Sequence, residues 1–315
     1  MLAGSSCGSK PPTPITNTPP PVVEAPGIAC PADLKVDASG AAPTVVAYSA
    51  PVVSGGAQPV TTNCTITSGT AFPVGISDVV CTARDSASRS ASCVFHVTVT
   101  PVYKLRGTRF TALGDSIANG EVAAPSDYLP DLAYPHLLEG MLRARYTTQT
   151  AVVRPVGAYG KLAKDNYEDL RADLLKSVPD ALLILSGVND INSRDPGQIA
   201  VVRDGLQSMI RVAKSSGVQI VFLSTLLPQV VGRSRAYAPE LIEPANAMIR
   251  ALAASEGVIL VDNHAALIGQ AGFYIGDDGL HPSPAGHQKI AETFFESIKT
   301  NYEVPVTQAP ARLRR

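Results

Sequence analysis

The sequence predicts an α/β fold, in which helices cover both faces of a parallel β-sheet, preceded by a small all-β sandwich. From about residue 108 onward, short apolar runs alternate with amphipathic stretches of helical period. Between residues 28 and 101 the runs are short, alternate apolar with polar residues, and are separated by Gly and Pro. Regular strand–helix alternation is typical of parallel sheets, whereas closely spaced short strands are typical of sandwiches. The two patterns therefore predict two domains of different class.

A proline-rich segment, residues 1–27, precedes the sandwich and shows no hydrophobic periodicity. Such a segment favours extended, semi-rigid conformations, so we interpret it as a tether. Cys7, with Gly8 and Ser9 after it, resembles the mature start of a bacterial lipoprotein, although Gly4 stands where leucine is usual. The segment therefore predicts either a lipid anchor at Cys7 or a plain leader.

Residues 28–101 predict an immunoglobulin-like sandwich of about seven short strands. Its clearest alternating runs are Thr44–Tyr48, Val60–Thr67, Val79–Ala83 and Val94–Val99. The segments Cys30-Pro31, Phe72-Pro73-Val74-Gly75 and Ser92-Cys93-Val94-Phe95 resemble the HYR (hyalin repeat) module. The resemblance implies a surface contact with glycan or protein, or a spacer. We favour the spacer, because the sequence shows no concave polar site here.

Four of the five cysteines lie in this domain, and an even set in so short a segment predicts two disulfides in an oxidising, extracytoplasmic compartment. Three pairings are possible. In an immunoglobulin-like sandwich the first strand commonly runs parallel to the last, which brings Cys30 and Cys93 together. Cys64, late in a middle strand, then faces Cys81, early in the antiparallel penultimate strand. We therefore predict Cys30–Cys93 and Cys64–Cys81, with Cα separations of about 4.4–6.8 Å.

A linker at residues 102–107 leads to the second domain, which we expect over residues 108–303 before a flexible tail at 304–315. Apolar runs predict its strands at Phe110–Leu113, Ala151–Val153, Ala181–Leu185, Val218–Leu223 and Val258–Val261. Amphipathic stretches predict its helices at Pro135–Tyr146, Asn166–Lys176, Ile199–Ser215, Pro239–Ser255 and Pro284–Lys299.

Residues suited to nucleophilic catalysis follow the ends of these strands. Ser116 comes directly after the first strand, and Asn189 follows the third. Asp278 and His281 stand three positions apart near the C-terminus. A serine hydroxyl needs an imidazole to take its proton and a third group to orient that imidazole. We therefore expect Ser116 as nucleophile, His281 as base and Asp278 as its orienter; the other histidines lie in the sandwich, lack an acid at this spacing or fall within a helix.

The motifs Gly114-Asp115-Ser116, Gly187-Val188-Asn189-Asp190 and Asp278-Gly279-Leu280-His281, with a glycine block between the first two, resemble the four blocks of the SGNH (GDSL-type) ester hydrolases. The resemblance implies a three-layer, flavodoxin-like sheet and an acyl-serine intermediate. It also implies that the backbone N–H of Ser116, a glycine N–H and the Asn189 amide bind the oxyanion.

The glycine block reads Arg154-Pro155-Val156-Gly157-Ala158-Tyr159-Gly160, which departs from the family's Asn-x-x-x-x-Gly. We prefer Gly160 for the oxyanion donor, because Asp165-Asn166 follows at the family's usual offset, and Gly157 is the alternative. Asp115 and Asp190 are expected to hold loops in place.

Charge and motifs exclude several other functions. The net charge is −1, so nothing favours nucleic acid or an anionic membrane surface. The sequence contains no run of about 20 apolar residues. Asp277, Asp278, His281 and His287 could suggest a metal, but no zinc-helix motif is present, and we predict neither metal nor cofactor.

The sequence therefore predicts a secreted or surface-attached serine esterase acting on a small ester or an acylated glycan. The absence of a long lid insertion between the blocks favours short or soluble esters. Within enzymes, carbohydrate O-deacetylation and lysophospholipid cleavage are both open. The alternative outside enzymes is an adhesive or glycan-binding surface protein whose hydrolase domain is degenerate.

Overall fold

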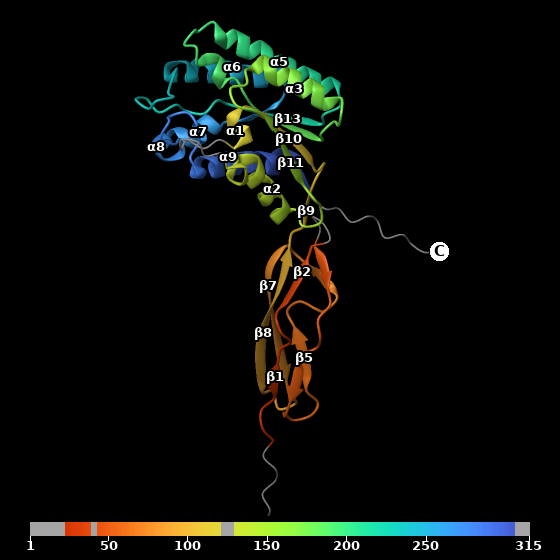
Figure 1. The fold of residues 1–315 in the computed structure, drawn as a ribbon. Coiled ribbons are helices and arrows are strands. Elements are labelled where there is room, and N and C mark those ends of the chain that lie inside the picture. Colours follow the sequence, from red (N-terminus) through yellow and green to blue (C-terminus); the bar gives the residue numbers. More distant parts are fainter. Residues whose placement is uncertain (1–22, 39–42, 121–128, 306–315) are drawn as a thin grey trace, which may run out of the picture. The chain divides into compact units, whose positions relative to one another are not determined.

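The computed structural model describes residues 23–38, 43–120 and 129–305 and divides the chain into two compact units, Met1–Pro101 and Val102–Arg315 (Figure 1). Cys7 and most of the expected tether and tail lie outside the described residues. None of the described helices is long and apolar enough to cross a membrane.

The first unit is built from strands. They are β1 (Gly27–Ala29), β2 (Leu34–Asp37), β3 (Thr44–Val46), β4 (Val52–Ser54), β5 (Thr61–Cys64), β6 (Thr70–Phe72), β7 (Gly75–Arg84) and β8 (Ser90–Thr100). One sheet has the order β2-β8-β7-β5, and β1 with β4 and β3 with β6 form separate antiparallel pairs. Along β7 and β8 buried residues alternate with more exposed ones, and the inward side chains, among them Phe95 and Val97, form one core with Phe72.

Both predicted disulfides are present. Cys30 is bonded to Cys93 with a Cα separation of 5.7 Å. The strand parallel to β8 is the second strand, β2, and Cys30 lies between β1 and β2. Cys64 is bonded to Cys81 across the antiparallel β5–β7 pair, where the two residues stand directly opposite each other. Their Cα atoms are 4.0 Å apart, so the expected range was wrong for this bond. Directly opposite residues of an antiparallel pair have Cα atoms only about 4.5–5.5 Å apart, toward the short end of the usual disulfide range.

The expected linker and tail are partly wrong. Residues Tyr103–Leu105 form strand β9, which pairs antiparallel with β15 (Glu303–Pro305). Leu105 is buried, and its backbone exchanges hydrogen bonds with the side-chain amide of Gln149. The segment after Pro101 is therefore part of the second unit, because its backbone groups and apolar side chains have partners there.

The second unit is a parallel sheet with helices on both faces. Its strands are β10 (Arg109–Gly114), β11 (Val152–Gly157), β12 (Ala181–Leu185), β13 (Ile220–Ser224) and β14 (Ile259–Val261). Their order in the sheet is β11-β10-β12-β13-β14, and each pair is parallel. The strand that follows β10 in the chain, β11, lies on one side of it, and the next strand, β12, lies on the other side. In parallel sheets where the strand order reverses in this way, ligands bind beyond the carboxyl ends of the strands.

Alternate residues of each strand face opposite helical layers. Leu113, Leu182 and Ile184 pack against α3 (Ala163–Leu174), α5 (Gln198–Ser215) and α6 (Pro239–Glu256). Ala112 and Leu183 pack against α2 (Tyr134–Arg145), α7 (Asn263–Ile268) and α9 (Pro284–Tyr302) on the other face. Figure 1 shows these two layers on either side of the strands.

The predicted strands and long helices are all present, with ends displaced by a few residues. The short elements were not predicted: α1 (Ser116–Asn119), a 3₁₀ turn at Pro130–Leu132, α4 (Val188–Ile191), α7 and α8 (Ala271–Tyr274). Helices of one turn carry too few residues to show a period, so capping and tertiary contacts decide them.

Candidate active site

Ser116 is placed by the junction of β10 and α1. Gly114 ends the strand, and a side chain there would meet the carbonyl oxygen of Leu185 at 2.5 Å, so only glycine fits beside β12. The Asp115 carboxylate accepts the backbone N–H of Ile117 at 3.0 Å and caps α1, as expected of a loop-holding residue. Ser116 is the first residue of α1 and is only 4% exposed.

The structure brings Ser116, His281 and Asp278 together in one row, which we call the triad. The Oγ of Ser116 lies 2.9 Å from Nε2 of His281, and Nδ1 of His281 lies 2.6 Å from Oδ2 of Asp278. An ionised carboxylate only accepts hydrogen bonds, so we assign the imidazole proton to Nδ1. Nε2 then accepts the serine hydroxyl hydrogen bond and is in position to take its proton.

The surroundings of Asp278 favour the ionised form of its carboxyl group. Burial alone would raise its pKa, but three hydrogen bonds outweigh that effect and hold the pKa below its usual range. They come from the His281 ring and from the backbone N–H groups of Leu280 and His281, the latter two at 2.9 Å from Oδ1. The short loop therefore fixes the carboxylate and the imidazole with the same backbone turn.

The loop between β13 and α6 (residues 225–238), which we call the bracing loop, donates hydrogen bonds to the loop that carries Asp278 and His281. The N–H of Val230 donates to the carbonyl of Gly279 at 3.0 Å, and the N–H of Arg235 donates to that of Asp278 at 2.6 Å. The Arg233 guanidinium donates to the carbonyls of Ile275 and Gly276 at 2.7 and 2.8 Å. Neither arginine was predicted as a site residue from the sequence. The only available signal was that Arg233 and Arg235 also follow the end of a predicted strand.

The two candidate oxyanion glycines have different surroundings. Gly157 ends β11, and a Cβ there would lie 2.7 Å from the carbonyl oxygen of Gly114, so this glycine is needed for close packing. Gly160 is exposed, adopts a left-handed conformation with φ of 72°, and has open space where a side chain would be.

Asn189 is tied to the loop that carries Gly160. It lies in α4, which follows Gly187, a glycine with φ of 114°. The Asn189 side-chain amide donates to the carbonyl of Lys161 at 3.0 Å, and the neighbouring Asp190 carboxylate accepts the N–H of Ala163 at 3.0 Å. Burial raises the pKa of Asp190, although the Ala163 N–H opposes that shift. Asp190 thus holds the loop, as expected.

The other histidines lie in other surroundings. His96 pairs with Asp78 in the first unit, and His136 is exposed on α2. His264 lies 3.7 Å from a Glu243 oxygen. His287 is buried in α9, where Nδ1 accepts the N–H of Tyr134 at 3.3 Å. The described residues contain no group of three or more His, Cys, Asp or Glu side chains that could hold a metal ion.

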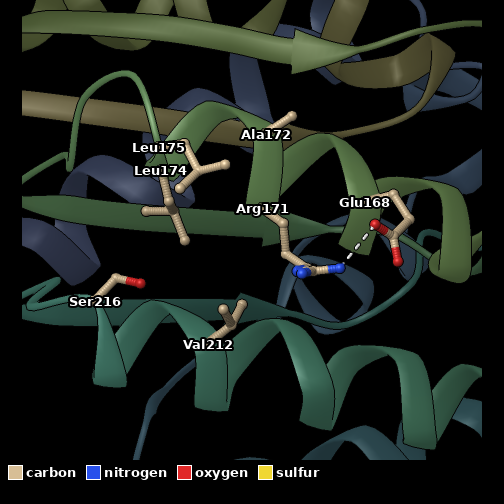
Figure 2. A pocket seen from close by; sticks show the side chains of 7 residues that line it. All are labelled: Glu168, Arg171, Ala172, Leu174, Leu175, Val212 and Ser216. Atoms are coloured by element: carbon tan, nitrogen blue, oxygen red, sulfur yellow. Dashed lines mark hydrogen bonds and ion pairs between the residues drawn. The ribbon is translucent and has the colours of Figure 1, made fainter.

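A cavity of about 360 Å³ lies between α3 and α5 and is a separate feature (Figure 2). Its lining residues are Glu168, Arg171, Ala172, Leu174, Leu175, Val212 and Ser216. They lie in or next to the C-terminal halves of the two helices, which end at the amino edge of the sheet, whereas the triad lies at the carboxyl edge. Two of these residues, Arg171 and Glu168, form the ion pair drawn as a dashed line in Figure 2.

Each of the two units matches a known protein family. The model of the GDSL-like lipase/acylhydrolase family matches residues 112–289, and the HYR domain model matches residues 18–99. No curated protein matches the chain in sequence.

Among solved structures, the chain is similar to a lipase/acylhydrolase from Enterococcus faecalis, with 22% identity, a TM-score of 0.54, and coverage of 62% of this chain and 97% of the other. The chain is also similar to an alpha/beta hydrolase enzyme from the metagenome of Lake Arreo, Spain, with 21% identity, a TM-score of 0.52, and coverage of 62% of this chain and 96% of the other. A third similar structure is a mutant of an acetyl-xylooligosaccharide esterase from Geobacillus stearmophilus, with 20% identity, a TM-score of 0.52, and coverage of 62% of this chain and 96% of the other. At these identities the likeness shows a shared fold.

Proposed function

Because the chain belongs to the GDSL-like lipase/acylhydrolase family, we propose that it is a serine esterase that hydrolyses carboxylic esters through an acyl-serine intermediate. The observation that carries this proposal is the triad, with Ser116 Oγ at 2.9 Å from His281 Nε2 and His281 Nδ1 at 2.6 Å from the Asp278 carboxylate. The base is thus within hydrogen-bond distance of both the nucleophile and the orienting acid before substrate binds.

In the first half-reaction, Ser116 Oγ attacks the ester carbonyl carbon while its proton moves to Nε2 of His281. The imidazolium is stabilised by Asp278 at Nδ1. When the tetrahedral intermediate collapses, Nε2 returns the proton to the departing alcohol, which leaves the acyl group on Ser116. In the second half-reaction, a water molecule gives a proton to Nε2 and attacks the acyl carbon. Collapse releases the carboxylic acid and restores the serine hydroxyl.

The oxyanion of both intermediates needs donors that are already in position, each worth about 2.7–4 kcal/mol when removed. The N–H of Ser116 is one candidate, because the first residue of a helix has no intrahelical acceptor for it. Asn189 is the second: its amide has two N–H groups, and the hydrogen bond to Lys161 uses one of them. The backbone N–H of Gly160 is the third candidate, since this left-handed glycine directly precedes Lys161, whose carbonyl accepts the Asn189 amide.

The direct test is stoichiometric labelling with a fluorophosphonate, which reacts only with an activated serine. We expect one label per chain, lost in Ser116→Ala and retained in Ser208→Ala, a control on the exposed face of α5. Activity on para-nitrophenyl esters should follow the label. A chain that is folded but neither labelled nor active would contradict the proposal and leave the non-catalytic alternative.

Several finer assignments belong to the same proposal. The two disulfides support an extracytoplasmic location, secreted or at the cell surface. The strand order β11-β10-β12-β13-β14 supports the flavodoxin-like class, and the paired sheets of the HYR domain support an immunoglobulin-like sandwich. For the HYR domain we propose a spacer role, with contact to surface glycan or protein as the alternative.

A further inference from the structure

Arg235 places a cation beside the triad, in the loop between β13 and α6. Its backbone N–H donates to the carbonyl of Asp278 at 2.6 Å, which fixes the start of the side chain. One guanidinium nitrogen lies 3.8 Å from Oδ2 of Asp278 and 3.4 Å from Nδ1 of His281. About a third of the side chain is exposed, so the guanidinium is accessible from solvent at this position.

The triad does not use the hydrogen-bond donors of Arg235. Both oxygens of Asp278 already accept shorter hydrogen bonds, from the backbone of Leu280 and His281 and from the His281 ring. A separation of 3.8 Å is too long for a further one. The 3.4 Å contact with Nδ1 joins two donors, because Nδ1 carries the proton that Asp278 accepts.

Tyr159 is the partner that the structure gives to the Arg235 side chain. It lies between Gly157 and Gly160, is 64% exposed, and accepts a guanidinium N–H on its hydroxyl oxygen at 3.3 Å. The guanidinium carbon lies 5.7 Å from the centre of the tyrosine ring. Within the described residues the structure shows no acceptor for the phenol's own O–H. The pair therefore presents donors only: the remaining guanidinium N–H groups and the phenol O–H.

The neighbouring cations are already engaged. Arg233 donates to the carbonyls of Gly272, Ile275 and Gly276, and Lys161 pairs with Asp169 at 2.9 Å. Arg235 is thus the charged side chain next to the triad that keeps donors for a ligand, as far as the described chain shows. A planar guanidinium with a phenol O–H beside it matches the acceptor oxygens of a carboxylate.

We propose that Arg235 and Tyr159 bind a carboxylate carried by the substrate, so that the enzyme prefers acidic esters over neutral ones. The proposal rests on the esterase function and specifies its substrate class. The carboxylate can belong to the acyl part, as in a half-ester of a dicarboxylic acid. It can also belong to the alcohol part, as in an acylated sugar acid.

The experiment compares matched esters that differ only in charge. On the acyl side, mono-para-nitrophenyl adipate is compared with its methyl-capped diester. On the alcohol side, para-acetoxybenzoate is compared with its methyl ester, each rate divided by the rate of alkaline hydrolysis. The readout is the ratio of kcat/KM for the acidic ester to that for the neutral one, because a general loss of activity cancels from it.

We expect the acidic ester to be preferred in one arm, and that arm identifies the side that carries the carboxylate. In Arg235→Gln the preference should fall about tenfold or more, since a charge-assisted hydrogen bond is lost. Arg235→Lys should retain part of it, and Tyr159→Phe should lose a smaller part. Arg203→Gln, on the exposed face of α5 and paired with the adjacent Asp204, is the control that should keep the wild-type ratio.

Three results have distinct meanings. Hydrolysis of neutral esters without preference for acidic ones in either arm would overturn this inference and leave the esterase function standing. An equal loss on both esters in Arg235→Gln would overturn it as well, because Arg235 would then act only by positioning Asp278. No hydrolysis of any ester, together with no fluorophosphonate label, would instead contradict the esterase function itself.

Discussion

Gly279, between the acid and the base of the triad, offers the sharpest test of how the loop geometry produces activity. Its φ is 84°, in the left-handed region, and a Cβ there would lie 2.6 Å from Cβ of Arg233 and 3.0 Å from the carbonyl oxygen of Val230. Both neighbours belong to the bracing loop and are tied to its backbone, so neither can rotate away. Gly279→Ala therefore forces a backbone shift in one of the two loops.

The matched control is Gly257→Ala, at the end of α6. Gly257 has φ of 59°, but a side chain there would meet nothing within 4 Å. Both variants carry the cost of a left-handed alanine, about 1–2 kcal/mol. Gly279→Ala adds the cost of overpacking, about 1–3 kcal/mol. We therefore expect a loss of about 2–5 kcal/mol in unfolding free energy at position 279, against about 1–2 kcal/mol at position 257.

Activity should separate the two variants further. A displacement of about 1 Å in catalytic geometry can lower the rate about 100-fold, so Gly279→Ala should lose most of its kcat on a para-nitrophenyl ester. Gly257→Ala should keep its kcat, because α6 ends away from the triad. The measurements are denaturant unfolding and steady-state kinetics well below the unfolding transition. If Gly279→Ala kept the wild-type kcat, the bracing loop would not constrain the triad.

The other predictions concern the triad, acid stability and the disulfides. Ser116→Ala and His281→Ala should each reduce ester hydrolysis to background, and the double variant should be scarcely worse, because the residues act as a unit. Burial would raise the pKa of Asp180, but hydrogen bonds from Arg109 and the Thr108 backbone hold it below its usual range. This carboxylate therefore stabilises the fold above its unfolded pKa near 4 and loses that contribution as pH falls through the lower folded value. Asp180→Asn should cost about 1–2 kcal/mol at neutral pH and progressively less as the pH falls below about 4, as denaturant unfolding over a series of pH values will show. Reduction of the Cys30–Cys93 bond, which closes a loop of 63 residues, should destabilise the HYR domain by about 4 kcal/mol on the chain-entropy model. Ester hydrolysis should persist after reduction, and loss of activity on adding reductant would show that the second unit depends on the first.

The long elements could be predicted because burial imposes either a continuous apolar run or an apolar period on their sequences. β12 is buried at every residue and was predicted with its observed ends, and Leu206, Met209, Ile210 and Ala213 mark the buried face of α5. β9 and β15 were missed for a physical reason. Each has three residues, and pairing between segments about 200 positions apart leaves no local signal in either. Their assignment to linker and tail followed from composition alone.

The residues to which we assign the reaction were predictable because the chemistry restricts both their type and their place. Ser116 and Asn189 stand just beyond the ends of β10 and β12, whereas Asp278 and His281 share the loop between α8 and α9, and few side chains can replace them. Substrate recognition imposes no such restriction. An arginine that binds a substrate carboxylate can come from any loop at that edge of the sheet. Whether it lies near the substrate depends on the conformation of that loop, which the neighbouring residues in the sequence do not reveal. Arg235 reaches the triad only because its backbone donates to Asp278, and Tyr159 meets it from a loop 76 positions away. The residues that we propose to select the substrate are therefore those that sequence patterns are least able to find.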